Sequence, residues 1–288
     1  MYTDPAVYAP KNCTEMWETF HQSYSGHDEC GTPEQNYYKF AEAAYNNVKE
    51  NRSAFWEGLQ VFMDEFSENG RRFVGIADTF TGYVLNNCAW CGAQKDDSRS
   101  STCNDGCTNC TFKWAPNCTE HSFWAAASRQ YAKNATGRVT LFLNAARPSV
   151  YNKYGLFTTH ELPELYWPKN SHVDVRLVLP TLGIVPTEKC ETGSLLELRT
   201  LIESKNLTMT CTHYPLDVRH FKCADDSEAM ECRFYYDPEC LMTVERGQEA
   251  KCAYRSSGSQ TTCVTALLYS VLVFVFVVNV YFMTNLVR

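Results

Sequence analysis

The sequence predicts an α/β (α+β) protein: a helix-rich N-terminal half, and a C-terminal half with a small, mainly parallel sheet flanked by helices. Three observations predict this class. Aromatic residues recur at helical spacing through residues 13–70, buried-strand patterns begin only after Gly137, and a helix separates two of these strands. Helices followed by strands with a helix between them indicate an α-rich half and an α/β half, with a cleft between the two.

The helical elements come first along the chain. Apolar residues recur at helical spacing in four segments, which are residues 16–24, 37–45, 54–68 and 122–134. The third segment ends at Asn69-Gly70, a good helix stop, and Gly137 follows the fourth. Residues 73–87 mix β-branched and aromatic side chains, which predicts a short strand and a turn.

The strands follow, at residues 138–144, 173–180 and 207–213. Before the last strand, Ser194-Leu195-Leu196-Glu197 is a capping box that opens a helix ending at Ser204. Between the first two strands, Pro163 fixes its own φ and restricts the residue before it. The loop 157–165, which contains Glu161, is therefore predicted to be stiff and extended.

Three regions follow from this pattern. They are a helix-rich domain at 1–137 with a Cys-rich loop at 88–118, an α/β domain at 138–253 that carries the Glu161 loop, and a tail at 254–288. The tail holds an uncharged run, 264–287, after the small residues 256–259 and a polar spacer. This order is typical of a glycosylphosphatidylinositol (GPI) anchor signal. A transmembrane helix is the alternative, but a single basic residue, Arg288, follows the run.

The composition predicts an extracellular protein stapled by disulfides. Fifteen cysteines are too many for a reducing cytosol, and six Asn-x-Ser/Thr sequons favour a secreted or surface protein. The net charge is -7 and no basic run exceeds Arg71-Arg72, so nucleic acid is not an expected partner. The run Cys103-x3-Cys107-x2-Cys110-x7-Cys118 has zinc-like spacing, but disulfides are the stronger interpretation outside the cell. The scattered histidines predict no metal centre.

Several catalytic motifs are absent from the sequence: it has no Walker loop, no GxGxxG after a strand, no HExxH and no GxSxG elbow. What remains is the carboxylate of Glu161 and four tryptophans, Trp56, Trp90, Trp124 and Trp167. An indole face stacks on a flat base, and a carboxylate stabilises the oxocarbenium-like sugar that forms as the base leaves. This combination suits cleavage of an N-glycosidic bond. The alternative is core tryptophans and a surface glutamate.

A series of short motifs points to one family. In chain order they are Cys13-x3-Trp17, Phe55-Trp56, Asp78-Thr79, Gly82-Tyr83, Trp90-Cys91-Gly92, Ser122-Phe123-Trp124, Ser128, the Glu161 loop, Gly193-Ser194-Leu195-Leu196 and the ladder Cys190-x20-Cys211-x11-Cys223-x8-Cys232. From about Cys13 to Cys232 the chain resembles the ADP-ribosyl cyclase / NAD glycohydrolase family, which includes the molluscan cyclase and the mammalian lymphocyte ecto-enzymes. The resemblance implies a cell-surface enzyme that takes NAD as its substrate, needs no cofactor, and releases nicotinamide and ADP-ribose.

The resemblance also implies a role for individual residues. Glu161 matches the catalytic glutamate of the family. Trp56 and Trp124 match two tryptophans that hold the nicotinamide end and the ribose. Ser128 matches a serine that hydrogen-bonds the reacting ribose or phosphate region, and Asn86 lies at a polar position near nicotinamide.

Two departures from the family pattern bear on the product. The family's Thr-Leu-Glu-Asp-Thr-Leu run is Gly75-Ile76-Ala77-Asp78-Thr79-Phe80 here. Asp78 is therefore kept as a substrate-binding residue, whereas Ala77 replaces the acidic residue that contacts the nicotinamide amide in the family. Leu156 stands where an aromatic ring favours cyclisation and a small polar residue favours water. We therefore expect mainly hydrolysis, with minor ADP-ribosyl cyclase and cyclic ADP-ribose hydrolase activity. The alternative, which Ala77 favours, is a non-catalytic surface receptor or adhesion module on the same fold.

The cysteines, the glycans and the ends of the chain complete the expectations. The resemblance implies four disulfides, Cys190–Cys211, Cys223–Cys232, Cys91–Cys103 and Cys30–Cys110. The N-terminus lacks a signal peptide, which leaves a truncated start or membrane insertion through the C-terminus as alternatives. The odd number of cysteines favours the truncated start, as does Cys13, which matches a cysteine whose family partner lies upstream. Glycans are expected at Asn51, Asn134 and Asn206. Association into a homodimer is left open.

Overall fold

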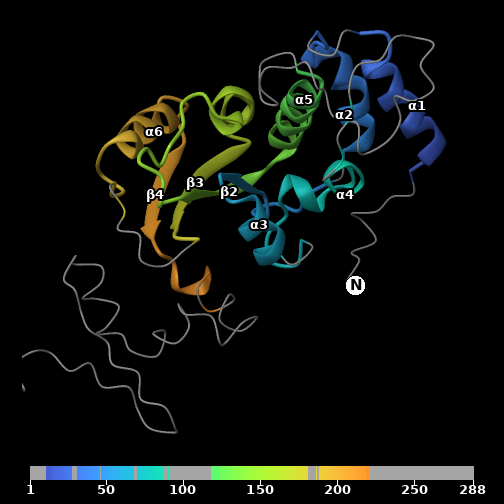
Figure 1. Ribbon diagram of the computed structural model, residues 1–288. Coiled ribbons are helices and arrows are strands. Elements are labelled where there is room, and N and C mark those ends of the chain that lie inside the picture. Colours follow the sequence, from blue (N-terminus) through green and yellow to red (C-terminus); the bar gives the residue numbers. More distant parts are fainter. Residues whose placement is uncertain are drawn as a thin grey trace, which may run out of the picture. The chain divides into compact units, whose positions relative to one another are not determined.

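The computed structural model describes residues 11–27, 31–45, 47–67, 70–86, 88, 90, 118–180, 186, 188–218 and 220 (Figure 1). The chain divides into two units, Met1–Pro215 and Leu216–Arg288, and every helix and strand named below belongs to the first. This unit combines helices with a small parallel sheet, as the sequence predicts. Within the described residues, no helix is both long and apolar enough to cross a bilayer. The predicted anchor signal at 254–288 lies outside them.

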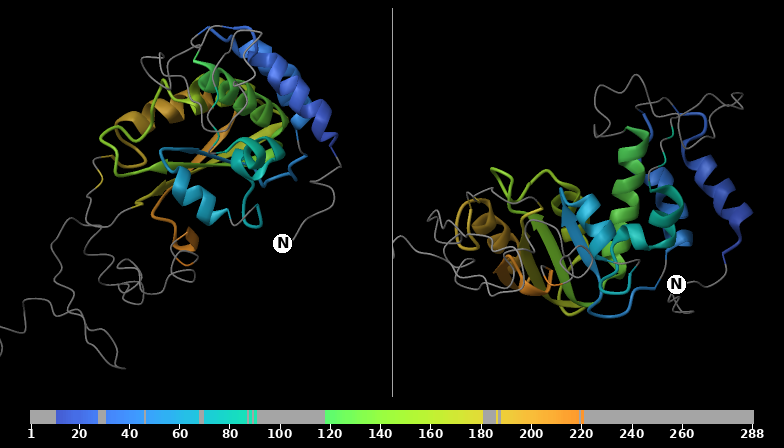
Figure 2. Two further views of the ribbon diagram at one scale, coloured as in Figure 1. Left: turned by 45° about the vertical axis from the view of Figure 1, so that its right-hand side comes forward. Right: turned by 60° about the horizontal axis from the view of Figure 1, so that its bottom comes forward.

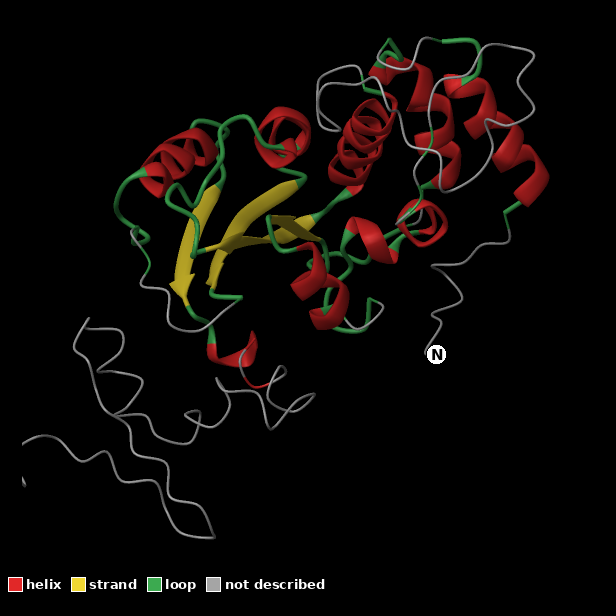
Figure 3. Ribbon diagram, viewed as in Figure 1, coloured by secondary structure: helices red, strands yellow, loops and turns green. Residues whose placement is uncertain are grey.

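One parallel sheet of four strands forms the centre of this unit (Figure 3). In spatial order the strands are β1 (Ala54–Glu57), β2 (Gly137–Asn144), β3 (Asn170–Val178) and β4 (Thr208–His213). Residues 139–143 of β2 are all buried, because both faces of this strand are covered. Since the strands run in one direction, the carboxyl ends of β1 and β2 meet at one edge. Ligand sites of α/β proteins form at such edges.

The edge strand corrects a prediction. Helical spacing predicts one helix over residues 54–68, but residues 54–57 are strand β1, and helix α3 (Gln60–Phe66) follows a turn at Gly58, where φ is 66°. The aromatic residues of this segment are buried against opposite sides of the sheet, so their helical spacing does not mark one helix face. The sheet takes its edge strand from the N-terminal half and therefore crosses the boundary predicted at residue 137.

Helices cover the sheet on both sides (Figure 2). α5 (Thr119–Asn134) and α6 (Ser194–Glu203) lie on one side, and α3 lies on the other. Phe55 of β1 contacts Tyr131 of α5, with ring centroids 5.2 Å apart, whereas Phe142 of β2 contacts Phe66 of α3 at 5.5 Å. Alternation of side chains along the strands sends these two contacts to opposite faces.

A second core joins the N-terminal helices to α5. α1 (Cys13–Tyr24), η1 (Glu34–Tyr37) and α2 (Tyr38–Ala44) meet α5 in an aromatic cluster that contains Phe20, Phe40 and Phe123. Trp90 lies inside this cluster, 4% exposed, and donates to the Tyr37 hydroxyl at 3.0 Å. Trp90 is therefore a core tryptophan, which the sequence alone left undecided.

Residues 73–87 also differ from the prediction of a strand and turn. They contain a short helical turn, η2 (Ile76–Asp78), and helix α4 (Phe80–Leu85). Thr79 accepts a hydrogen bond from the Gly82 amide at 3.4 Å and so caps α4. Gly82 has no Cβ, which allows α4 to pack directly on the backbone of η2.

Helix α6 is confirmed, but its predicted capping box is not formed. Gly193 is the N-cap residue, with φ at 57°. The Ser194 hydroxyl instead donates to the carboxylate of Glu188 and accepts from the Tyr151 amide at 2.9 Å. Ser194 thus connects α6 to the segment that follows β2.

The disulfide Cys190–Cys211 is confirmed, and it joins the approach to α6 to strand β4. The thiols of Cys13 and Cys118 are free. The cysteines of the other three predicted disulfides lie outside the described residues. Cys103, Cys107 and Cys110 of the zinc-like run also lie outside them.

The three predicted glycosylation sites differ in how their side chains are held. Asn51 accepts from the Arg138 amide at 2.7 Å, and Asn134 donates to the Gln130 carbonyl at 2.8 Å. Asn206 lies exposed in the turn after α6, with φ at 59°. Asn51 also lies exposed in a turn, with φ at 64°, whereas Asn134 is half-buried at the end of α5, so Asn51 and Asn206 are the more accessible positions for a glycan.

We predict that Gly82→Ala destabilises the protein. A Cβ at this position would collide with the Ile76 carbonyl and the Ala77 Cα, which are backbone atoms that cannot move cheaply. Overpacking of this kind costs about 1–3 kcal/mol, or roughly 2–4 °C in Tm for each kcal/mol. Gly75→Ala is the control, because φ there is -88° and a Cβ meets nothing closer than 3.5 Å. Equal melting temperatures of the two variants would contradict this account.

Candidate active site

Helix α5 supplies one wall of a cavity of about 210 Å³ at the carboxyl edge of β1. Its contributors are Glu120, Trp124, Ser128 and Tyr131. Spacings of four and three residues place these side chains on one face of the helix. Glu120 and Ser128 are 4% and 3% exposed, so this polar stripe is buried before any ligand arrives.

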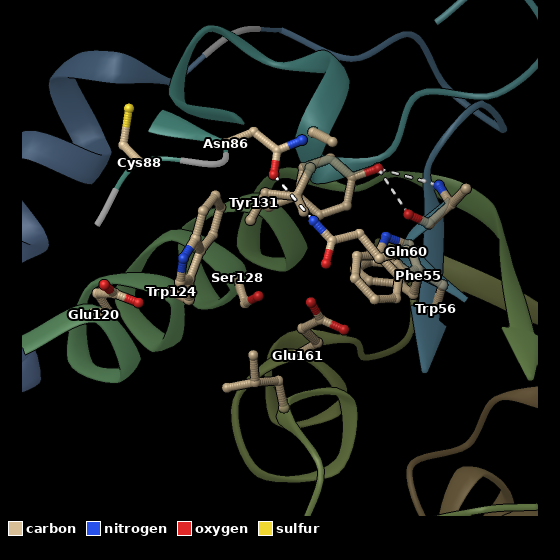
Figure 4. Close-up of a pocket in the computed structure, with 14 residues that line it drawn as sticks. Phe55, Trp56, Gln60, Asn86, Cys88, Glu120, Trp124, Ser128, Tyr131 and Glu161 are labelled. Atoms are coloured by element: carbon tan, nitrogen blue, oxygen red, sulfur yellow. Dashed lines mark hydrogen bonds between the residues drawn. The ribbon is translucent and has the colours of Figure 1, made fainter. Parts of the chain in front are cut away.

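The opposite wall comes from β1 and the elements after it. Trp56 ends the stretch of β1 that lines the cavity, and Gln60 opens α3. Ala77 of η2 and Asn86, the residue after α4, complete this wall. Figure 4 shows Trp56 and Trp124 on opposite sides of the cavity, with the Glu161 carboxyl pointing into the space between them.

The segment that carries Glu161 is helical, which corrects the prediction of an extended loop. Phe157–Glu161 form a single π-helical turn, η3, and Leu162–Glu164 form a 3-10 turn, η4. Pro163 fits in the first turn of η4, where an amide hydrogen has no partner to lose. The buried side chains of Phe157 and Leu162 fix the turn in the core. A π-helical turn is wider than an α-helical one and is frequent at functional sites.

Burial dominates the electrostatics of Glu161. Its side chain is 6% exposed, and desolvation raises the pKa of the carboxyl to about 8. A hydrogen bond with the Ser128 side chain lowers the pKa, and the negative charge of Glu57 raises it. A carboxyl in a cavity with a strongly shifted pKa is a candidate for catalysis.

An amide pair lies across the cavity from Glu161. Gln60 donates from Nε2 to the Asn86 Oδ1 at 3.2 Å, and a hydrogen bond from Asn86 lowers the pKa of Asp64, which burial otherwise raises. These contacts tie α3 to the end of α4 and fix the orientation of both amides.

Of the eight site residues that the sequence predicts, seven line the cavity: Glu161, Trp56, Trp124, Ser128, Asn86, Ala77 and Leu156. Asp78 does not. It accepts from the Gly75 amide at 2.7 Å and the Ser67 hydroxyl at 2.9 Å, and so holds η2 in place beneath Ala77. Trp167 is 59% exposed and is not a cavity residue either.

Sequence reasoning missed four polar residues at or near the cavity: Gln60, Glu120, Tyr131 and Glu57. Helical spacing back and forward from Trp124 would have found Glu120 and Tyr131. The sequence predicts one helix over residues 54–68, whereas Glu57 ends strand β1 and Gln60 begins helix α3. The positions of these two side chains relative to the cavity therefore could not be predicted.

An ion-pair network supports the Glu161 turn from behind. Arg129 of α5 donates to Glu34 at 2.8 Å, to Glu164 at 3.0 Å, and lies 3.3 Å from the His160 Nδ1. Both carboxylates hold the pKa of Arg129 above its usual range, and burial lowers the pKa of His160. The network connects η1, α5 and η4, so the residue before Glu161 is held from outside the cavity. Among the side chains that the structure describes, no group of three or more His, Cys, Asp or Glu could hold a metal ion.

The same fold occurs in known proteins. A family model described as ADP-ribosyl cyclase matches residues 2–232. The ADP-ribosyl cyclase/cyclic ADP-ribose hydrolase of Aplysia californica is 32% identical over 235 residues, which cover 81% of this chain and 80% of that protein. The human ADP-ribosyl cyclase/cyclic ADP-ribose hydrolase 2 is 28% identical, with 77% of this chain and 68% of that protein covered.

Solved structures agree. The crystal structure of Aplysia cyclase complexed with substrate NGD and product cGDPR superposes with a TM-score of 0.68 at 31% identity, covering 77% of this chain and 86% of that one. Porcine CD38 with a covalent intermediate shares the fold, with a TM-score of 0.61 at 22% identity and 71% and 87% coverage. The chain therefore belongs to the ADP-ribosyl cyclase family of NAD-processing enzymes, as its motifs predict.

We predict that Glu161→Gln stabilises the protein at alkaline pH. The folded-state pKa of about 8 lies above the ordinary glutamate pKa of 4.5, so the folded protein holds a proton that the unfolded chain releases. The free energy of unfolding therefore falls as pH rises from about 4.5 to 8. The neutral amide removes this loss, which is on the order of several kcal/mol at pH 8.5 and less than about 1 kcal/mol at pH 5.

Thermal unfolding at the two pH values checks this prediction. The control is Glu203→Gln, whose side chain is 55% exposed and should leave the pH dependence unchanged. A Glu161→Gln variant with the wild-type pH dependence of Tm would show that the carboxyl is not buried in its neutral form.

Proposed function

We propose that the protein is an extracellular NAD glycohydrolase, which cleaves the nicotinamide–ribose bond of NAD to give ADP-ribose and nicotinamide. The observation that carries the proposal is the buried carboxyl of Glu161 between the indoles of Trp56 and Trp124. Membership of the ADP-ribosyl cyclase family supports it, as does the activity for which the Aplysia californica relative is named.

The chemistry asks for one carboxylate. The nicotinamide of NAD is a cation while bonded to ribose and leaves as a neutral molecule, so no general acid is required. As the bond breaks, positive charge develops at the anomeric carbon, and Glu161 stabilises it or bonds to that carbon. Water then adds a hydroxyl to the carbon and loses a proton, which releases ADP-ribose and restores the carboxylate.

The walls of the cavity have separate tasks in this reaction. The flat nicotinamide ring stacks on an indole of Trp56 or Trp124, which positions the bond over the carboxylate. Ser128 hydrogen-bonds the reacting ribose or the carboxylate beside it. An approaching cationic substrate lowers the pKa of Glu161, so binding itself promotes the ionised form that the reaction needs.

Leu156 and Ala77 favour hydrolysis as the main outcome. Leu156 lacks an aromatic face on which adenine could stack and fold the substrate for cyclisation. Ala77 offers a methyl group where an acid would hold the nicotinamide amide, which leaves the Gln60–Asn86 pair as the polar part of that wall. Cyclase and cyclic ADP-ribose hydrolase activities are expected as minor routes.

The second candidate is a non-catalytic surface receptor or adhesion module on the same fold. Ala77 favours it, because an acidic group for the substrate is lost there. The convergence of Trp56, Trp124, Ser128 and Glu161 on one cavity argues against it, since a binding module has no use for a buried carboxyl between two indoles.

Incubation of the purified protein with NAD tests the proposal. We expect nicotinamide release with ADP-ribose as the main product, separated from cyclic ADP-ribose by chromatography. Glu161→Gln should reduce release by about 1,000-fold or more while the protein remains folded, because the positive charge at the anomeric carbon then has no carboxylate. Glu203→Gln is the matched control and should keep full activity. Retained activity in Glu161→Gln excludes the catalytic assignment, and a mainly cyclic product excludes the product assignment.

The cell-surface location is part of the proposal. It is supported by the Cys190–Cys211 disulfide, which is typical of an oxidising compartment, and by the GPI-type signal in residues 254–288. Self-association into a homodimer stays a prediction.

We predict that a phosphatidylinositol-specific phospholipase releases the protein from intact expressing cells. This enzyme cleaves the phosphatidylinositol part of a GPI anchor, whereas a transmembrane helix resists it. Surface antibody staining before and after treatment measures the release. Unchanged staining would favour the spanning helix, and absence of staining on intact cells would contradict the extracellular location.

A further inference from the structure

Glu57 is a second buried carboxyl beside the active site, and the reaction described above does not use it. It is the last residue of β1, directly after Trp56, and it is 7% exposed. Charged residues are rarely buried to this extent unless a specific interaction holds them. The question is which part of the molecule requires this carboxyl.

The strand aims Glu57 toward the Glu161 turn. Alternation along β1 places Glu57 on the same face as Phe55. Phe55 contacts Phe157, the first residue of η3, with ring centroids 5.7 Å apart. The carboxyl therefore lies on the side of the sheet that faces η3 and, at its far end, Glu161.

The partner of the carboxylate is a turn formed by residues 152–155. Oε2 of Glu57 accepts a hydrogen bond from the Asn152 amide at 3.2 Å. Its Oε1 lies against Gly155, so close that a Cβ at position 155 would collide with it. Glycine at 155 is thus required for the carboxylate to fit into the turn.

This turn leads directly into the catalytic segment. The Gly155 amide donates to the Asn152 carbonyl at 2.9 Å and closes the turn, and the Thr158 hydroxyl donates to the same carbonyl at 3.0 Å. The Thr159 amide then donates to the Gly155 carbonyl at 3.0 Å. Leu156 follows the turn and η3 continues to Glu161, so a displacement of the turn would displace both cavity residues.

Opposing effects set the pKa of Glu57. Burial raises its pKa to about 7, while the Asn152 amide and the guanidinium of Arg147 lower it. Its charge in turn raises the pKa of Tyr151, which adjoins the turn.

The charge of Glu57 also reaches Glu161. Burial is the main cause of the raised pKa of that carboxyl; the Ser128 hydrogen bond opposes it and the Glu57 charge adds to it. Burial likewise raises the pKa of Tyr131 on α5, and Glu161 adds to that shift. Two carboxyls that interact in a buried site titrate as a pair.

We propose that Glu57 is a positioning residue for the reaction: its carboxylate fixes the 152–155 turn that presents Leu156 and Glu161, and its negative charge acts on the Glu161 carboxyl. It acts through these residues and does not touch the substrate. The inference rests on the proposed function, because it is Glu161 chemistry that Glu57 adjusts.

The test is the pH profile of kcat/KM for nicotinamide release from NAD, between pH 5 and 9. Glu57→Gln keeps an oxygen that accepts from the Asn152 amide but removes the charge. Its acid limb should move to lower pH by about 0.5–1 unit, which raises kcat/KM roughly 3- to 10-fold on that limb. Its plateau at high pH should stay within about 3-fold of wild type. Glu57→Ala also removes the anchor and should lose about 10-fold or more at the plateau.

The matched control is Glu188→Gln. Glu188 accepts a hydrogen bond from the Val150 amide at 3.3 Å, and Val150 lies in the same connection between β2 and η3 as the 152–155 turn. The charge of Glu188 is not one of those that act on Glu161. Its acid limb should coincide with that of wild type. Far-UV circular dichroism and Tm of each variant separate loss of folding from loss of function.

Each outcome decides between the two claims. An active wild type with an unshifted acid limb in Glu57→Gln overturns the inference and leaves the proposed function standing, as does a Glu57→Ala variant with a full plateau. A wild-type protein that releases no nicotinamide overturns the proposed function, and the inference with it. If Glu57→Ala fails to fold, the profile of Glu57→Gln against Glu188→Gln still decides.

Discussion

The burial of the Glu161 carboxyl is the constraint on which the rest of the site depends. Removing a carboxylate from water costs free energy unless another charge or several hydrogen bonds replace the water. Here Ser128 provides one hydrogen bond, and the pKa rises to about 8. In the proposed reaction the cationic nicotinamide ring of NAD provides the missing counter-charge. The carboxyl is thus held protonated until substrate binding lowers its pKa, which couples recognition of the substrate to activation of the carboxylate.

Helix α5 makes this arrangement mechanically possible. One face of α5 packs in the aromatic cluster through Phe123, which anchors the helix in the N-terminal core. Another face gives Trp124 and Ser128 to the cavity, and a third gives Arg129 to the network behind η3. A single rigid element therefore fixes the indole, the hydrogen-bond partner of Glu161 and the support of the turn that carries it. Glu161 is thus held by Ser128 inside the cavity and by the Arg129 network outside it, so its side chain loses little entropy when the transition state forms.

Much of this could be predicted from the sequence, and the failures have separate physical causes. The strands after Gly137 and helix α6 were predicted because each element buries one continuous pattern. Strand β1 was not, since four residues are too short to show a period and their aromatic neighbours imitate a helix. The Glu161 turn was predicted to be extended because Pro163 was treated as a breaker, although a proline at the start of a helical turn breaks nothing. Glu57 could be recognised only once β1 and the 152–155 turn were placed side by side, which is tertiary information.

In the proposed reaction, bond cleavage and the grip on the nicotinamide end depend on different elements of the cavity. We propose that cleavage depends on Glu161 and its surroundings, which η3 and α5 fix through Phe157 and Ser128. The grip on the nicotinamide end depends on Ala77 and the Gln60–Asn86 pair, which belong to η2, α3 and the end of α4. These two groups share no hydrogen bond among the described residues. Under this proposal Ala77 changes the grip on the nicotinamide end without disturbing the Glu161 carboxyl, so the loss of one family acid is compatible with a working catalytic centre.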